Sequence, residues 1–160
     1  MNKISIVMGS DSDLAVVNEA IGMLRKFKAK FEVKILSAHR TPKELEAYVE
    51  RAAGQGVKVF IAAAGGAAAL AGVIAAHTTL PVIGIPMETR SLKGLDSLLS
   101  TVQMPAGIPV GCMAIGKPGA KNAAIFALEI LAISDKKIEA RLLKHKQDMR
   151  IKIRKTRIKL

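Results

Sequence analysis

Short apolar runs alternate with amphipathic stretches along the first 133 residues of the chain. Apolar runs predict strands over residues 3–8, 57–63, 81–86 and 110–115, and the alternation of apolar with charged residues predicts another over 31–36. Between them, apolar residues three or four positions apart predict helices over residues 14–27, 43–50, 73–77, 94–102 and 120–133. This alternation predicts a parallel sheet covered by helices on both faces. We therefore expect an α/β protein, a three-layer αβα sandwich with a flavodoxin-like sheet and the strand order 2-1-3-4-5.

The C-terminal segment differs from the rest of the chain in charge. From residue 136 onward there are eleven Lys and Arg against two acids, a net charge of +9, whereas the remainder carries +3 of the total +12. Ser134 or Asp135 is expected to cap a helix, which has apolar positions at Ile138, Leu142 and Leu143. The sequence thus divides into an α/β domain over residues 1–134 and a basic C-terminal helix and tail over 135–160. The last ten residues alternate Ile with Lys or Arg, which predicts a solvated, frayed end or, alternatively, a contact with nucleic acid or acidic partners.

Composition limits the class of protein. Half of the 160 residues are apolar, which indicates one globular domain with a sizeable core. No apolar run is long enough to cross a bilayer, and the residues before the first strand do not resemble a signal peptide. The single cysteine, Cys112, lies in an apolar run and is typical of a core position rather than a nucleophile. No Cys/His cluster has metal-ligand spacing, so we expect no metal site. The absence of a spanning run and of a signal-like start leads us to expect a cytoplasmic protein.

The turn between the second strand and its helix carries three chemically useful side chains. Residues 37–42 read Ser-Ala-His-Arg-Thr-Pro, with Thr41 as a plausible N-cap and Pro42 at the first helical position. Ser37 offers a hydroxyl, His39 a proton carrier near neutral pH, and Arg40 a fork for phosphate. The alternative is a capped turn with a surface His and Arg.

Two further turns follow strands. In Gly-Ser-Asp-Ser-Asp at 9–13, hydroxyls and amides at a helix start can hold an anion, and Asp13 can accept bonds from ribose hydroxyls; alternatively, Ser12 or Asp13 only caps the helix. The small residues from Ala64 to Gly72 let a flat base lie against the backbone, or they serve tight helix–sheet packing. Because all three turns follow strands of one parallel sheet, we expect them to meet at its carboxyl edge.

Together these motifs resemble the PurE family, whose class I members are N5-carboxyaminoimidazole ribonucleotide mutases of purine biosynthesis. The resemblance runs from about Ile4 to Ile133 in the family's order. Arg40 after His39 and the Gly65-Gly66 pair are similar to class I; class II enzymes typically have Lys after the His and Gly-Arg-Ser-Asn in the third turn. The motifs that carry the resemblance are Gly9-Ser10-x-Ser12-Asp13, Ser37-Ala38-His39-Arg40-Thr41-Pro42, Ala64-Gly65-Gly66-Ala67-Ala68, Gly94-Leu95-Asp96-Ser97-Leu98, Val102-Gln103-Met104-Pro105 and Gly107-Ile108-Pro109-Val110.

The resemblance implies an isomerase that moves a carboxylate from N5 to C4 of the imidazole through CO2 and aminoimidazole ribonucleotide. His39 would be the acid–base group, because one imidazole can carry both protons in turn. No cofactor, metal, biotin or ATP is required. The family also implies a homo-octamer in which the C-terminal helix packs across a neighbouring subunit, with no membrane or nucleic-acid partner. The implied substrate-binding residues are Ser10, Ser12, Asp13 and Arg40 at the ribose phosphate, Ser37 and Ala38 at the pocket wall, and Ala64, Gly65 and Leu70 around the imidazole and CO2.

The chain departs from the class I pattern at a few positions. Ala69 stands where His is usual, Ala71 where Pro is usual, and Glu88 and Arg90 where small or neutral residues are common. Ala69 removes a polar group that would border the CO2 site. Two other functions fit the same residues: a carboxylase that uses CO2 with aminoimidazole ribonucleotide, and a nucleotide- or RNA-binding module without catalysis. The basic tail favours the binding module, whereas one Tyr and no Trp leave it little for base stacking.

Overall fold

The computed structural model of the chain describes residues 3–158. Five parallel strands form one sheet in the order β2-β1-β3-β4-β5, so the predicted class and strand order are confirmed. Among residues 3–158, none of the helices has the length and hydrophobicity needed to cross a membrane. The elements are β1 (Lys3–Met8), η1 (Asp11–Asp13), α1 (Leu14–Lys26), β2 (Phe31–Ile35), α2 (Pro42–Ala52), β3 (Val57–Ala64), α3 (Leu70–Ala76), β4 (Val82–Pro86), α4 (Leu95–Val102), β5 (Gly111–Cys112), α5 (Gly116–Ala132) and α6 (Lys136–Lys155).

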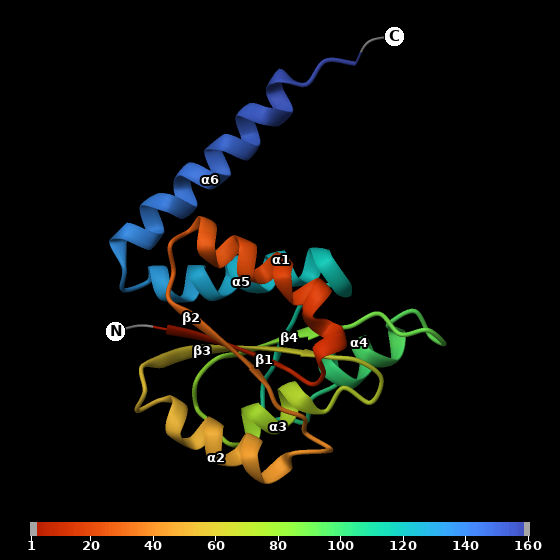
Figure 1. The fold of residues 1–160 in the computed structure, drawn as a ribbon. Helices are drawn as coiled ribbons and strands as arrows, with labels where there is room; N and C mark the ends of the chain where they lie inside the picture. The colour runs from red at the N-terminus through yellow and green to blue at the C-terminus, as the bar shows by residue number, and fades with distance from the viewer. Residues whose placement is uncertain (1–2, 159–160) are drawn as a thin grey trace.

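The sheet is the middle of three layers. Helices α1 and α5 cover one face, and α2 and α3 cover the other (Figure 1). Side chains of a strand alternate between faces, so Ile4 and Ile6 of β1 join the first core while Val7 joins the second. A strand with both faces covered reads as a nearly continuous apolar run, which is why β1, β3 and β4 were visible in the sequence.

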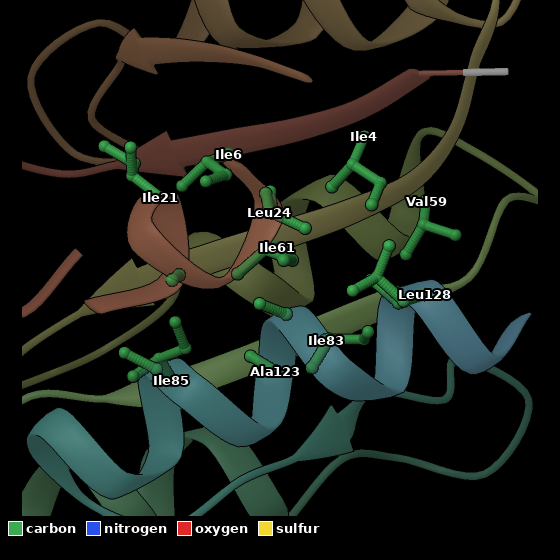
Figure 2. Close-up of a cluster of buried hydrophobic side chains, with 14 of the residues drawn as sticks. Ile4, Ile6, Ile21, Leu24, Val59, Ile61, Ile83, Ile85, Ala123 and Leu128 are labelled. Atoms are coloured by element: carbon green, nitrogen blue, oxygen red, sulfur yellow. The ribbon is translucent and has the colours of Figure 1, made fainter. Parts of the chain in front are cut away.

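The larger core lies between the sheet and the helix pair α1 and α5. Figure 2 shows Ile6 and Ile61 of neighbouring strands beside Leu24 of α1, with Leu128 of α5 closing the layer. All four side chains are fully buried. Burying a side chain of this size stabilises the fold by about 1.5–3 kcal/mol, so this layer holds the strands in place and fixes where their carboxyl ends lie.

Three predicted elements differ by three or more residues from the structure at one end. The strand expected over residues 110–115 is only Gly111–Cys112, because this edge strand has β4 as its single neighbour and pairs only with Ile83 and Gly84. The following helix starts at Gly116 rather than at residue 120, since proline is tolerated in a first helical turn. Helix α3 starts at Leu70 instead of residue 73, because Leu70 and Ala71 are buried in the second core and belong to its packing stripe.

Helix α6 begins at Lys136 and leaves the domain (Figure 1). Asp135 is the cap, as its Oδ1 accepts hydrogen bonds from the backbone N–H groups of Lys137 and Ile138 at 2.9 and 3.2 Å. Ile138 and Leu142 are buried in the chain's own first core, so they need no second subunit to cover them, contrary to expectation. Leu143 is 64% exposed. The helix continues to Lys155, so residues 151–155 of the predicted frayed end are helical, while residues 159 and 160 lie outside the described part of the chain.

Candidate active site

The three predicted turns meet in one cleft at the carboxyl edge of the sheet. They follow β1, β2 and β3, which are neighbours in the sheet, and the direction of the connections reverses at β1, where ligands bind in open parallel sheets. The cleft has a volume of about 540 Å³. It is lined by Gly9, Ser10, Ser12, Asp13, Ser37, Ala38, His39, Arg40, Ala64, Gly65, Ala67, Ala68, Ala69, Leu70, Met87 and Glu88.

The first turn is held by a capping box, and its cap is Ser10 rather than Ser12 or Asp13. The Ser10 hydroxyl accepts a hydrogen bond from the Ser12 N–H at 3.3 Å, and the Asp13 carboxylate accepts one from the Ser10 N–H at 3.2 Å. These bonds form the short helix η1, and α1 continues from it. The Ser12 hydroxyl also donates to the Ser10 hydroxyl at 3.0 Å, so both hydroxyls lie together at a helix start, where negative charge is favoured.

Asp13 is one of two acidic groups in the wall of this cleft, the other being Glu88. Burial raises the pKa of the Asp13 carboxyl above its usual value, although the Ser10 N–H and the nearby Arg40 charge act in the opposite direction. Burial disfavours the charged form because the low-dielectric surroundings solvate it poorly. An anionic carboxylate here is therefore poised to accept hydrogen bonds from a ligand that brings donors of its own.

The second turn is closed by Ser37 and Thr41. The Thr41 hydroxyl accepts a hydrogen bond from the Ser37 N–H at 2.8 Å and donates to the Ser37 carbonyl at 3.2 Å. Thr41 stands at the N-cap position, but its side chain caps no helical N–H, so the predicted capping bond is absent from α2. Pro42 occupies the first helical position as predicted. The residues between Ser37 and Thr41, including His39, therefore lie on a loop that these two hydrogen bonds close.

Arg40 links the second turn to the first. Its Nη2 donates to the Gly9 carbonyl at 2.8 Å, and its Nε donates to the Ser37 hydroxyl at 3.4 Å. A guanidinium has five N–H groups in a fixed fork, and these two bonds fix its orientation toward the cleft. His39 and Arg40 are both exposed, so a ligand in the cleft can reach the imidazole and the guanidinium directly.

The third turn brings backbone into the wall of the cleft. A side chain added at Gly65 would put its Cβ 3.3 Å from the Met87 Cβ, so a larger residue here would fit only if the segment after β4 shifted slightly. Gly66 has a φ of +68°, a conformation that glycine adopts at no steric cost. Its N–H donates to the buried Ser97 hydroxyl of α4 at 2.9 Å, which fixes the height of the turn above the sheet.

All ten candidate site residues predicted from the sequence line the cleft. The sequence missed Met87 and Glu88, which come from a fourth turn after β4; their position directly after a strand was the signal that could have found them. Ala69 also lines the cleft. The half-buried Cys112 does not belong to this wall, and burial raises the pKa of its thiol, which fits the prediction that it is no nucleophile.

Comparison with known proteins identifies the family. Residues 3–152 match the family model described as AIR carboxylase. The chain belongs to the AIR carboxylase family. The match covers the α/β domain and most of α6, so the helix that leaves the domain is part of the AIR carboxylase family's own pattern.

Individual relatives agree with this assignment. The chain is 53% identical over 150 residues to the N5-carboxyaminoimidazole ribonucleotide mutase of Pyrococcus abyssi, covering 94% of this chain and 85% of the relative. It is 46% identical over 158 residues to the mutase of the same name from Saccharolobus solfataricus, covering 99% of both. The crystal structure of Treponema denticola PurE superimposes with a TM-score of 0.87 at 26% identity, covering 96% of this chain and 94% of that one. The resemblance found in the sequence motifs is thereby confirmed.

Proposed function

We propose that this AIR carboxylase family chain is an N5-carboxyaminoimidazole ribonucleotide mutase, an isomerase of purine biosynthesis that moves a carboxylate from N5 to C4 of the imidazole. The relatives named above carry this activity in their names. The single observation that carries the proposal is the meeting of an imidazole, a guanidinium, three serine hydroxyls and a strip of backbone without bulky side chains in one cleft. A phosphate, a ribose and a flat ring can each find a partner there.

The chemistry needs one proton carrier. Breaking the bond between N5 and the carboxylate carbon releases CO2, and N5 takes up a proton. C4 then attacks the trapped CO2, and the proton on C4 leaves, so the overall reaction gains and loses no proton. His39 is assigned both transfers, because the pKa of a free imidazole lies near neutral pH and the same group can give and then take a proton.

The phosphate end of the substrate is assigned to Arg40 and the first turn. Arg40 is already oriented by the Gly9 carbonyl and the Ser37 hydroxyl, so little side-chain entropy is lost when it binds a phosphate. Ser10 and Ser12 offer hydroxyls at a helix start. Asp13 would repel a phosphate and is therefore assigned to the ribose hydroxyls, which can donate to it.

The imidazole and the trapped CO2 are assigned to the third turn. Ala64 and Gly65 present backbone with little side-chain bulk, and Leu70 lies buried beside them and lines the cleft. Ala38 completes the wall at the second turn. Apolar surroundings suit CO2, which is uncharged, and they slow its escape into water by excluding water from the cleft.

We also propose that the enzyme works as a homo-octamer in the cytoplasm, without nucleic-acid partners. Helix α4 and the residues before it expose an apolar surface made of Leu92, Leu95, Leu99 and Val102, each about half exposed. The last three lie four and three positions apart on α4 and so share one face of the helix, and an exposed apolar face of this kind marks an interaction site. Light scattering on the full chain tests the octamer, and a monomer at micromolar concentration contradicts it.

The test of catalysis is His39→Asn. Asparagine can hydrogen-bond but cannot shuttle protons, so turnover is expected to fall by about 10²–10⁴-fold, the usual contribution of a general acid–base group. Binding of the ribonucleotide, measured by calorimetry, is expected to change little. Turnover within about threefold of wild type removes His39 from this role, because that is well below the expected range.

The choice of substrate separates the mutase from its alternatives. The mutase converts the N5-carboxylated ribonucleotide directly. A carboxylase would instead require aminoimidazole ribonucleotide with bicarbonate as the CO2 source, and a binding module would convert neither. His145→Asn is the matched control for His39→Asn, because His145 lies on α6 against Phe27 and outside the cleft. Its replacement is expected to leave turnover unchanged.

A further inference from the structure

Helices α2 and α3 bring together three metal-ligating side chains far from the cleft. Glu46 and Glu50 lie one turn apart on α2, and His77 follows the last residue of α3. None of the three lines the candidate active site. Glu50 and His77 instead border a second cavity, of about 1130 Å³, which also includes Pro81 and Val82 at the start of β4. The cluster therefore belongs to the opposite edge of the sheet.

The geometry of the cluster suits one metal ion. One ligand atom from each side chain lies within 4.8 Å of the ligand atoms of the other two. The Glu46 Oε1 and the His77 Nδ1 are 3.8 Å apart, which is too far for a hydrogen bond. Two ligands bound tetrahedrally to zinc at 2.0–2.2 Å lie about 3.3–3.5 Å from each other. Small side-chain rotations therefore bring these atoms to ligand distances.

The charges of the cluster favour a cation. Like charges four residues apart on a helix repel each other, and neither Glu46 nor Glu50 forms an ion pair with a Lys or Arg within residues 3–158. A divalent cation between the two carboxylates would remove this repulsion and balance their charge. All three side chains are accessible, so an ion can reach them without opening the fold.

We propose that Glu46, Glu50 and His77 bind one Zn²⁺ ion, which joins α2 to α3. An imidazole with two carboxylates suits zinc, whereas Mg²⁺ and Ca²⁺ prefer sites made of oxygen alone. Three protein ligands leave a fourth position for water. The role is structural: the ion binds the folded chain, in which α2 and α3 are held side by side, and so stabilises it. This proposal is independent of the mutase activity.

The test is titration of ZnCl2 into the metal-free full-length chain, followed by calorimetry and thermal unfolding. Wild type is expected to bind one Zn²⁺ per chain and to unfold at a higher temperature with the metal. His77→Asn and Glu50→Gln are expected to weaken binding at least about tenfold, since even an outer-shell partner contributes 10–100-fold. Glu44→Gln on the same helix and His145→Asn are the controls, and both are expected to bind like wild type. MgCl2 is expected to give no shift in unfolding temperature.

Several results overturn the proposal. If His77→Asn and Glu50→Gln bind Zn²⁺ as tightly as wild type, the ion binds at another site and the proposal is wrong. If binding is lost only in His39→Asn, the ion binds in the catalytic cleft instead. Absence of binding to wild type also ends the proposal. Glu50 is exposed, so Glu50→Gln is expected to fold even if His77→Asn disturbs the end of α3; circular dichroism checks both.

Discussion

The most informative test of how the cleft is built is Ser97→Ala. Ser97 is fully buried in α4, and its hydroxyl accepts the Gly66 N–H at 2.9 Å. Alanine fills nearly the same space but leaves this N–H without its partner. An unsatisfied buried donor costs about 1–3 kcal/mol of unfolding free energy; because the Gly66 N–H is only partly buried, we expect a loss of about 1 kcal/mol, at the lower end of this range. For a chain of this length, each kcal/mol corresponds to about 2–4 °C in the unfolding temperature.

The same change is expected to raise KM more than it lowers kcat. Gly66 directly follows Gly65 in the third turn, so losing its anchor loosens the wall assigned to the imidazole without touching the proton carrier. Urea unfolding measures the first effect and steady-state kinetics the second.

Ser100→Ala is the matched control on the same helix. The Ser100 hydroxyl also contacts the Gly66 residue, donating to its carbonyl at 3.3 Å, but Ser100 is exposed. Water can replace that contact, so the loss is expected to stay within about 0.5 kcal/mol. Equal losses in the two variants, or an unchanged KM in Ser97→Ala, would refute the argument that the Ser97 bond fixes the turn.

Three further changes test other parts of the structure. Leu142→Ala is expected to lower the unfolding free energy by about 2–5 kcal/mol, measured by urea, whereas Leu143→Ala on the isolated chain changes it by less than about 0.5; equal losses contradict the burial of Leu142. Arg40→Ala is expected to raise KM more than it lowers kcat, since the phosphate does not react; the opposite split in steady-state kinetics contradicts its role. Burial raises the pKa of the Asp13 carboxyl above its ordinary value of 3.8, so the folded chain binds the carboxyl proton more tightly than the unfolded chain does. The stability that this protonation contributes is therefore present at low pH and is lost as the pH rises from about 3.8 through the pKa of the folded chain. When the free energy of unfolding is measured with urea from pH 3.5 to 7, Asp13→Asn is expected to remove this decrease. A dependence of the unfolding free energy on pH equal to that of wild type would contradict the argument.

The sequence was most informative where both faces of a strand are covered. The runs that became β1, β3 and β4 were recognised with small boundary errors, because most of their residues are apolar and buried. The edge strand β2 was recognised instead by the alternation of apolar and charged residues over Phe31–Ile35. The same signal failed at β5, since the apolar run around Cys112 cannot reveal that an edge strand pairs over only two residues. At α6 the stripe containing Ile138 and Leu142 correctly indicated burial, but hydrophobicity does not say which surface does the covering.

The candidate site was predictable to the extent that its residue types are unusual. His39 and Arg40 stood out in a turn, and the small residues after β3 stood out by their lack of bulk. Glu88 lines the cleft only because β4 ends beside it. Ser97 holds the third turn by a hydrogen bond from a helix, where a serine in the sequence does not indicate such a role. The cluster of Glu46, Glu50 and His77 was invisible for a similar reason: two elements well apart in the chain supply it, so no local spacing marks it.

The position of β1 between β2 and β3 determines when the cleft can exist during folding. Both neighbours of β1, the strands β2 and β3, lie downstream of it, so the first turn is synthesised long before the residues that face it. Parallel pairing needs a crossover for each strand, and such non-local contacts form slowly because loop closure precedes any gain in contact energy. A nascent chain whose β3 segment has not yet emerged from the ribosome therefore has no cleft. We expect substrate binding to be among the last properties that this protein acquires as it folds.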